Sequence, residues 1–342
     1  MRRALYILAS LLALGVIFAA WLAHSLWTPY RGFSRDGVFV EIPRGASTRV
    51  ISRLLEERGV VRSRWAFELL GRAWLKRRLQ AGEYFFERSA SSFAVLEALA
   101  EGRVYTRSVS IPEGLAMTEI ADLLEKEKLC HREDFLAAAR DPAPIRDLAP
   151  RARNLEGFLF PATYEFPRRV TAHEIVAAMV RRFRTVWEGL PADGRVAGYT
   201  PAEIITLASL VEEETGASGE RPVIAGVFYN RLRKKVALQC DPTVIYALRL
   251  NGRFDGALHT RQLRFNSPYN TYRYLGLPPG PITNPGQAAL RAALFPPRVE
   301  YFYFVADTKG GHFFSRTLAE HNANVTRYRR LLAEASREIL LR

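Results

Sequence analysis

Three consecutive glutamates, Glu212, Glu213 and Glu214, close an apolar segment in the stretch LASLVEEETG, residues 207–216. A carboxyl group at the carboxy-terminal end of a helix lies in the negative end of the helix dipole, which favours its protonated form. Neighbouring carboxylates and partial burial raise a carboxyl pKa in the same direction. A general acid that works near neutral pH needs such a raised pKa. The run therefore predicts acid catalysis, with a solvated acidic helix end as the alternative.

The helix that carries this run is predicted to begin just after Thr200. Thr200 and Glu203 have the spacing of a capping box, and Pro201 suits the first helical position. Apolar residues recur at helical spacing as far as Val211, and Gly216 is placed to end the helix.

A helical wheel separates the three glutamates. Glu213 points away from the apolar stripe, so we expect it to be solvated. Glu212 and Glu214 flank the stripe on its two edges, and the wheel alone does not choose between them as the acid.

Polar and aromatic residues of the kinds that hold sugars follow the acidic run. Amide, hydroxyl and aromatic groups bind sugars through hydrogen bonds and stacking. The candidate substrate-binding residues are Asn230, Gln239, Asp241, Asn270, Thr271 and Tyr272. Asp241 before Pro242 is also the pattern of a plain helix start, with Asp241 as the cap. His312 and His321 lack the spacing of zinc ligands, so we expect them to be structural residues and expect no metal.

The amino terminus predicts a membrane anchor. Residues 4–23 are almost entirely apolar, and a segment of this length is what a helix needs to cross a bilayer. A cleaved signal peptide is the alternative, but the −3 positions of its candidate cleavage sites are large residues. Arg2 and Arg3 favour a cytoplasmic amino terminus, and Trp27 and Tyr30 suit the outer interface.

Composition limits the classes of partner. The 342 residues are 48% hydrophobic and 25% charged, as in folded proteins. A net charge of +14 favours a polyanionic partner, but no nucleic-acid-binding motif is present, so we expect no nucleic acid. Two cysteines, Cys130 and Cys240, are too few for a disulfide framework.

A partial duplication organises the first half of the chain. The segment IPRGASTRVISRLLEE starts at Ile42, and IPEGLAMTEIADLLEK starts at Ile111. Each copy predicts a strand, a Pro/Gly turn and a helix, and a turn that favours the same residues twice is the alternative. A helix from Ser63 and a strand from Ala81 complete a predicted βααβ module, of a kind that often binds extended polymers.

Several ordered motifs resemble the YceG-like family of endolytic murein transglycosylases. They are LASLVEEET, FYNRL, LQCDPTVIYAL, YNTY, GLPPGPITNPG and YFYFVADTKGGH, with LEGFLFPATY and the AGEY and IPEG segments before them. The resemblance covers nearly the whole chain and implies Glu214, directly before Thr215, as the catalytic acid. Glu212, on the other edge of the helical wheel, is a candidate secondary acid. The chain departs from the family pattern at Ala162, usually Asp, and at Cys240, usually Ser or Thr.

The resemblance implies cleavage between N-acetylmuramic acid and N-acetylglucosamine within nascent glycan strands, which leaves 1,6-anhydro ends and terminates elongation. The implied partners are peptidoglycan strands, the membrane and peptidoglycan synthases. No cofactor is implied. Two alternatives remain: a membrane-anchored peptidoglycan-binding scaffold, and a muramidase-type hydrolase on the same fold.

The expected architecture is α+β with a single transmembrane helix, a LysM-like module and a mixed α+β catalytic domain. Its expected boundaries are 1–30 for the anchor, 37–107 for the module, 108–150 for a second strand-turn-helix unit and 151–342 for the catalytic domain. The expected location is the bacterial inner membrane, with the catalytic domain on the extracytoplasmic side.

Overall fold

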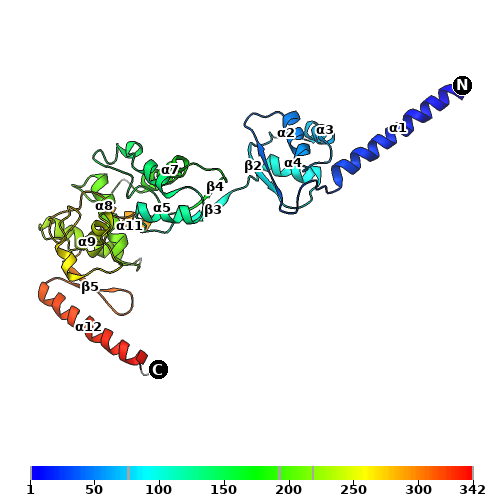
Figure 1. Cartoon of the computed structure of the whole chain (residues 1–342). Helices are drawn as coiled ribbons and strands as arrows, with labels where there is room; N and C mark the ends of the chain where they lie inside the picture. Colours follow the sequence, from blue (N-terminus) through cyan, green and yellow to red (C-terminus); the bar gives the residue numbers. More distant parts are fainter. Residues whose placement is uncertain (1, 75–77, 192, 194, 218, 341–342) are drawn as a thin grey trace. The chain divides into compact units, whose positions relative to one another are not determined.

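The computed structural model describes residues 2–74, 78–191, 193, 195–217 and 219–340, and it is a mixed α+β protein (Figure 1). The chain divides into two compact units. The first unit holds Met1–Arg107 and Glu165–Arg169, and the second holds Ser108–Tyr164 and Val170–Arg342. The segment 108–150, expected as a separate connector, lies in the same unit as the helices that follow it.

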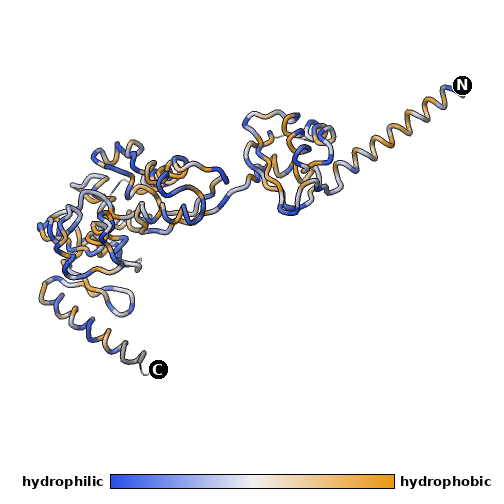
Figure 2. The backbone as a smooth tube through the Cα atoms, in the orientation of Figure 1, coloured by the Kyte–Doolittle hydropathy of each residue, from blue (hydrophilic) through white to orange (hydrophobic). Residues whose placement is uncertain are grey.

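Helix α1 (Arg2–Trp27) is long and apolar, and its span Leu5–Trp27 is long enough to cross a membrane (Figure 2). Most of its side chains are exposed, as in a helix whose partner is lipid. Its last turns differ, because Leu26 is buried in the core of the first unit and Leu22 packs against that core. The apolar helix expected at the amino terminus is therefore present.

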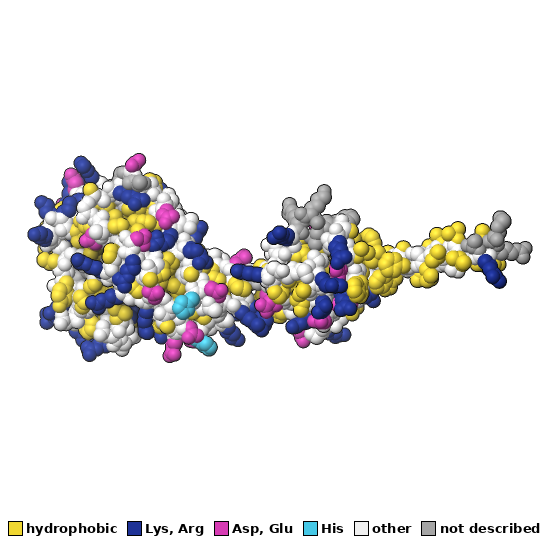
Figure 3. All heavy atoms as spheres, turned by 90° about the horizontal axis from the view of Figure 1, so that it is seen from above, with side chains coloured by type: hydrophobic (Ala, Val, Ile, Leu, Met, Phe, Trp, Pro, Cys, Tyr) yellow, Lys and Arg dark blue, Asp and Glu magenta, His cyan; other side chains and the backbone are white. Residues whose placement is uncertain are grey.

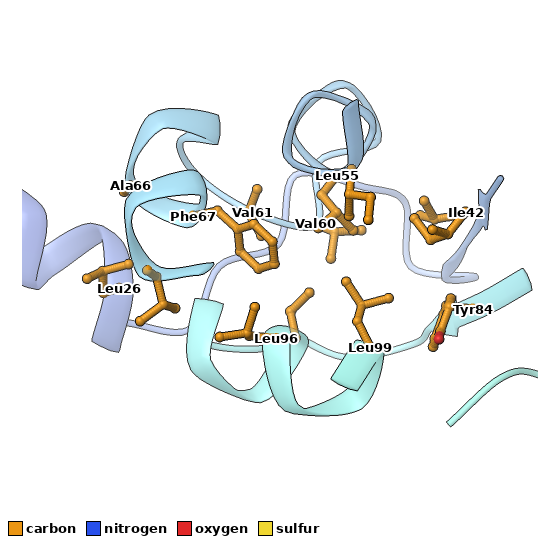
Figure 4. Close-up of a cluster of buried hydrophobic side chains, with 14 residues drawn as sticks. Leu26, Ile42, Leu55, Val60, Val61, Ala66, Phe67, Tyr84, Leu96 and Leu99 are labelled. Carbon is orange, nitrogen blue, oxygen red and sulfur yellow. The ribbon is translucent and has the colours of Figure 1, made fainter. Parts of the chain in front are cut away.

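The first unit contains the βααβ order that the sequence predicts. Its elements are β1 (Val38–Ile42), α2 (Thr48–Glu57), α3 (Arg64–Trp74) and β2 (Gly82–Phe86), followed by α4 (Ser92–Glu101). Strands β1 and β2 pair antiparallel. The helices bury an apolar core against one face of this two-stranded sheet. The core includes Leu26, Ile42, Leu55, Phe67, Tyr84 and Leu99 (Figure 4). Burial of such side chains is the main stabilising contribution to the module.

The other face of the β1–β2 sheet is covered by a segment that returns from later in the chain. Arg168 lies over the ring of Phe39 at 4.2 Å and pairs with Glu83 at 2.6 Å. Because Arg168 comes from beyond residue 164, the first unit is discontinuous in sequence.

The duplication is visible in the secondary structure. Strand β3 (Arg107–Ser110) and helix α5 (Met117–Lys126) repeat β1 and α2. Helix α5 begins and ends 69 residues after α2, which is also the separation between Ile42 and Ile111. Gly45 and Gly114 both have positive φ, at 76° and 82°, so the two turns need glycine for the same reason. The copies differ in pairing, since β3 pairs with β4 (Thr163–Phe166).

The second unit is built mainly of helices. Besides α5, these are α6 (Arg132–Ala139), η1 (Ala143–Ile145), α7 (Ala172–Gly189), α8 (Pro201–Glu214), α9 (Arg221–Arg233), α10 (Asp241–Leu250), η2 (Thr260–Arg264), α11 (Gln287–Leu294) and α12 (Leu318–Leu340). Helix α8 packs against α9, α10 and α11, and every residue from Ile204 to Val211 is buried. A helix enclosed in this way fixes the position of whatever follows its last buried turn.

The two ends of α8 determine where its acidic residues lie. Thr200 and Glu203 form the predicted capping box. The predicted glycine stop is wrong, because the helix ends at Glu214 and Thr215 is already extended, with φ −150° and ψ 132°. Gly216 does not have positive φ.

Strands β5 (Tyr303–Ala306) and β6 (His312–Ser315) pair antiparallel and form a hairpin. Helix α12 packs on it, and His321 stacks on Tyr303 with ring centroids 5.3 Å apart. The hairpin brings His312 into contact with the start of α9.

Candidate functional site

The three glutamates at the end of α8 face three different surroundings. Glu212 is almost completely buried, with 4% of its side chain exposed. Its carboxylate accepts from Nη2 of Arg221 at 2.7 Å and from the backbone N–H of Gly286 at 2.8 Å. The Oε2 of Glu113 lies 3.8 Å from the same Arg221 nitrogen. The Glu212 carboxylate is therefore held in an ion pair and is not open to a ligand.

Glu213 is exposed, as the helical wheel predicts. Protein nevertheless surrounds much of its carboxyl, and this loss of water, with smaller contributions from Glu119 and its two helix neighbours, raises the pKa of Glu213 to about 7. The turn of the second repeat lies against it, since a Cβ placed on Gly114 would be 3.1 Å from Oε1 of Glu213. Glu213 therefore titrates near neutral pH, which the wheel did not predict.

Glu214 is half-buried. Burial raises the pKa of Glu214, and the nearby negative charge of Asp241 raises it further. A side-chain hydrogen bond with Cys240 and interactions with His312 and Arg231 lower the pKa of Glu214, but burial is the largest effect. The result is a carboxyl that favours its protonated form yet has groups nearby that stabilise the carboxylate.

Asp241 is not the cap of α10. The cap position belongs to Cys240, and Asp241 is the first helical residue. Its carboxylate instead accepts a hydrogen bond from the hydroxyl of Tyr272 at 2.5 Å. The predicted cap is wrong because the chain enters the helix one residue earlier, which leaves the Asp241 carboxylate beside Glu214.

Cys240 is buried, and Cys130 is partly buried; both are free cysteines. The backbone N–H of Cys240 donates to Oγ1 of Thr271 at 3.0 Å. The residue before it, Gln239, has a left-handed backbone with φ 50° and an exposed side chain. The Gln239 amide is therefore open to a ligand next to the Cys240–Glu214 contact.

Three of the predicted sugar-binding residues use their side chains within the protein. The Asn230 amide donates to the carbonyls of Val299 and Tyr301, both at 2.8 Å. Asn270 is completely buried and donates to two carbonyls of its own loop. Thr271 is bound to Cys240 and to Thr243 Oγ1 at 2.9 Å. These residues shape the surroundings of Glu214, whereas Gln239, Asp241 and Tyr272 present accessible groups to it.

Arg231 is a site residue that the sequence reasoning missed. It is 6% exposed, and its guanidinium donates to the carbonyls of Phe302 at 2.6 Å and Leu238 at 2.7 Å. Burial lowers the pKa of Arg231, while interactions with Tyr303 and Glu214 favour its charge. An arginine inside the apolar run FYNRL was the available signal, because a buried arginine needs partners.

His312 is a second residue near Glu214 to which the sequence analysis gave no role in the site. Its Nδ1 lies 2.6 Å from Oε2 of Glu220, and its backbone N–H donates to the other oxygen at 3.0 Å. This pairing orients the ring near Glu214. Across the part of the chain that the structure describes, no group of three or more His, Cys, Asp or Glu residues could hold a metal ion.

A further carboxyl, Glu156, is buried in the second unit. It accepts from the backbone N–H of Met117 at 2.8 Å, the Asn284 amide at 2.9 Å and the Tyr246 hydroxyl at 3.2 Å. Burial raises the pKa of Glu156 to about 8, although these donors oppose the rise. The Asn284 side chain also accepts from Gly157 and donates to Leu115, so this cluster connects the second repeat to the loops around α8.

The arrangement around Glu214 suits acid–base chemistry on a ligand that reaches it from the Gln239 and Tyr272 side. Glu214 can give a proton, and Arg231 and His312 can then stabilise the charge that remains. Asp241 supplies a fixed negative charge that can stabilise a positive centre in a ligand.

Known proteins are similar in sequence to this chain over most of its length. The model of the YceG-like family matches residues 40–327. An endolytic murein transglycosylase of Bacillus subtilis is 33% identical over 330 residues, which cover 92% of this chain and 91% of that protein. An endolytic murein transglycosylase of Streptococcus pneumoniae is 31% identical over 93% of this chain and 63% of its own length. The crystal structure of a protein from Listeria monocytogenes described as yceG-like matches with a TM-score of 0.54 and 33% identity, covering 85% of this chain and 99% of that one.

Proposed function

The chain belongs to the YceG-like family, and from this we propose that it is an endolytic transglycosylase of peptidoglycan, a lyase. The names of its relatives in Bacillus subtilis and Streptococcus pneumoniae support the activity. The single observation that carries the proposal is Glu214, a half-buried carboxyl whose pKa is raised by burial and by Asp241. Cleavage of a glycosidic bond requires a general acid, and a raised pKa suits a carboxyl to that role.

In the reaction we propose, Glu214 protonates the glycosidic oxygen as the bond between N-acetylmuramic acid and N-acetylglucosamine breaks. Arg231, His312 and the hydrogen bond with Cys240 stabilise the carboxylate that remains. The carboxylate then removes the proton from the 6-hydroxyl of the muramic acid, and that oxygen bonds to the anomeric carbon. The products are a free N-acetylglucosamine hydroxyl and a 1,6-anhydro end, and no water is consumed. Because the nucleophile belongs to the same ring, its effective concentration is high.

Two neighbours of Glu214 have supporting roles in this proposal. The Asp241 carboxylate, fixed by the Tyr272 hydroxyl at 2.5 Å, stabilises positive charge as it develops at the anomeric carbon. The exposed Gln239 amide and the partly exposed Tyr272 ring bind the sugars. Asn230, Asn270 and Thr271 hold the surrounding loops and do not contact the sugar.

A muramidase-type hydrolase is the second candidate, and Asp241 is the observation that favours it. Glycosidases that add water use a second carboxylate as base or nucleophile, and Asp241 lies close enough to Glu214 to influence its pKa. The two mechanisms differ in product: a hydrolase leaves reducing muramic acid, and the lyase leaves the anhydro form. A scaffold without activity is the third reading, and it would not need a carboxyl with a raised pKa.

We also infer that the first unit anchors the enzyme and binds glycan. Helix α1 would cross the inner membrane once, with Arg2 and Arg3 in the cytoplasm and the catalytic unit on the wall side. The βααβ module of residues 37–107 would act as a LysM-like glycan-binding domain. A cavity of about 290 Å³ in the first unit is lined in part by Pro43, Arg44 and Gly82 of this module, and also by Pro167 and Arg169. Strand termination beside a peptidoglycan synthase fits an anchored enzyme that meets strands as they are made.

Mass spectrometry of the products tests the proposed function directly. Purified glycan strands incubated with the native chain should yield internal fragments that end in anhydro-muramic acid. Reducing ends would support the hydrolase, and intact strands would leave only the scaffold. For the module, the variant Arg44→Glu should bind isolated sacculi more weakly in a pelleting assay, while Arg58→Glu, on the same unit but outside the cavity, should bind normally. Equal binding by the two variants would contradict the cavity as the glycan site.

A further inference from the structure

Residues 249–275 form an exposed basic loop, which we call the arginine loop. It contains five arginines against one aspartate, Asp255. All five arginines are exposed: Arg249, Arg253, Arg261, Arg264 and Arg273. Exposed basic side chains are numerous elsewhere on the surface too (Figure 3), so charge alone does not distinguish this loop. The loop is distinguished by the hydrogen bonds that fix its backbone and by its position beside the end of α8.

The loop is held in one conformation from inside. The buried Asn270 amide donates to the carbonyls of Leu263 at 3.0 Å and Phe265 at 2.7 Å, and its oxygen accepts from the Tyr272 N–H at 2.9 Å. The Tyr274 hydroxyl donates to the Asn266 side chain at 2.8 Å. A buried polar group that satisfies three backbone groups strongly favours that backbone conformation. The arginines are therefore presented from fixed backbone positions.

Aromatic rings orient two of the guanidinium groups. Arg249 lies over Phe254 at 5.2 Å, and Arg253 lies over Phe265 at 5.6 Å. A guanidinium stacked on a ring keeps its N–H edge free for a carboxylate. Arg249 already pairs with Glu119 at 2.8 Å.

The remaining positive charges of the loop are not neutralised. Of the ion pairs formed within the described residues, none includes Arg253, Arg261, Arg264 or Arg273. Like charges held together on a rigid loop repel one another, and an anionic ligand relieves that repulsion.

Charge interactions link both ends of the loop to the end of α8. At one end, Arg249 acts on the carboxyl of Glu213. At the other end, Tyr272 donates to Asp241, which acts on Glu214. The Nη1 of Arg273, next to Tyr272, donates to the carbonyl of Arg264 at 2.9 Å and brings the middle of the loop towards this end. The arginine loop therefore borders the surface on which Glu214 is reached.

We propose that the arginine loop binds the free carboxylates of the peptide stems on the muramic acid residues next to the cleaved bond. This inference rests on the proposed function. In a strand that carries its stems, the sugars are N-acetylated and uncharged, and the carboxylates belong to the peptides. Arginine is the side chain that recognises carboxylates in a bidentate manner. The enzyme then selects strands whose stems are acidic over strands whose stem carboxylates are amidated.

The test uses two glycan strands of equal length that differ only in stem chemistry, one with free stem carboxylates and one with amidated carboxylates. The full-length native chain should cleave the carboxylate strand with the higher kcat/KM, by about tenfold if three exposed pairs contribute. The variant Arg253→Gln/Arg261→Gln/Arg264→Gln should bring this ratio close to one. It keeps Arg273 and therefore the bond to the Arg264 carbonyl. Added salt should also lower the ratio for the native chain.

The matched control is Arg181→Gln/Arg182→Gln, which removes two exposed arginines from α7 and should leave the ratio unchanged. Circular dichroism checks that each variant is folded. Equal kcat/KM of the native chain on the two strands overturns the inference while the proposed function stands. Equal cleavage together with arginine-dependent binding to phosphatidylglycerol vesicles would assign the loop to an anionic membrane and also overturn it. Failure to cleave either strand would overturn the proposed function itself.

Discussion

The carboxylate of Glu212 lies 2.7 Å from Nη2 of Arg221, and the two side chains are only 4% and 10% exposed. This buried ion pair joins the last turn of α8, which also carries Glu214, to the first turn of α9. A buried ion pair that loses one partner leaves a charge without compensation. Glu212 is therefore expected to hold the site together and not to transfer a proton.

We expect Glu212→Gln to lower the free energy of unfolding by about 3 kcal/mol, at the lower end of the range for a broken buried pair. The loss is limited because Glu113, 3.8 Å from Arg221, remains as a second carboxylate. Urea denaturation measures it, with the exposed Glu213→Gln as the matched control. A Glu212→Gln protein that is fully stable yet inactive would instead identify Glu212 as an acid.

Glu214→Gln should abolish strand cleavage without loss of folding. Glutamine preserves the size of the side chain but cannot donate a proton of suitable acidity, and acid–base assistance is typically worth about 10² to 10⁴-fold. Release of new strand ends from purified glycan gives the rate, and circular dichroism checks the fold. Near-normal activity in Glu214→Gln would show that the catalytic acid lies elsewhere.

Asp241→Asn should move the pH dependence of cleavage towards acid. The Asp241 charge raises the pKa of Glu214, so its removal lowers that pKa. Glu214 then loses its proton, and with it the ability to act as an acid, at a lower pH than in the native protein. Tyr272→Phe is the matched control, because it removes the 2.5 Å hydrogen bond but keeps the charge. The products should still have anhydro ends. An inactive Asp241→Asn protein together with reducing ends from the native chain would support the hydrolase.

Glu156 should make the protein less stable as the pH rises from about 4.5 to about 8. Burial raises the pKa of Glu156 from 4.5 to about 8, so within this window the carboxyl is protonated in the folded state and ionised in the unfolded chain. Raising the pH therefore favours unfolding, by up to about 1.4 kcal/mol per pH unit from this group. Below the window both states are protonated and the contribution to stability is fully present.

Glu156→Gln should remove this pH dependence, because glutamine stays neutral and can still accept from Met117 and Asn284 through one oxygen. Denaturation series at several pH values measure the slope for both proteins. A slope that is the same in the variant would show that Glu156 is ionised in the folded protein. The exposed Glu165→Gln serves as a control for the loss of a carboxyl alone.

Local sequence determined the elements because their signals lie within a few residues of one another. The capping box at Thr200, the glycine turns of the two repeats and the apolar run of α1 each predict an element from short-range geometry, and each element is present. The wheel also separated Glu213 from its neighbours, since the direction of a side chain on a helix follows from its position in the turn. Only the resemblance chose Glu214 over Glu212.

Tertiary structure decided what each charged side chain does. Glu212 and Glu214 are equivalent on the wheel, yet one meets Arg221 and the other meets Cys240 and Asp241, because different segments pack on the two edges of α8. Arg231 acquires its role from carbonyls brought to it by the packed strand and loop. Burial and the charges of distant segments set a pKa, and neither is encoded in the neighbouring residues of the chain.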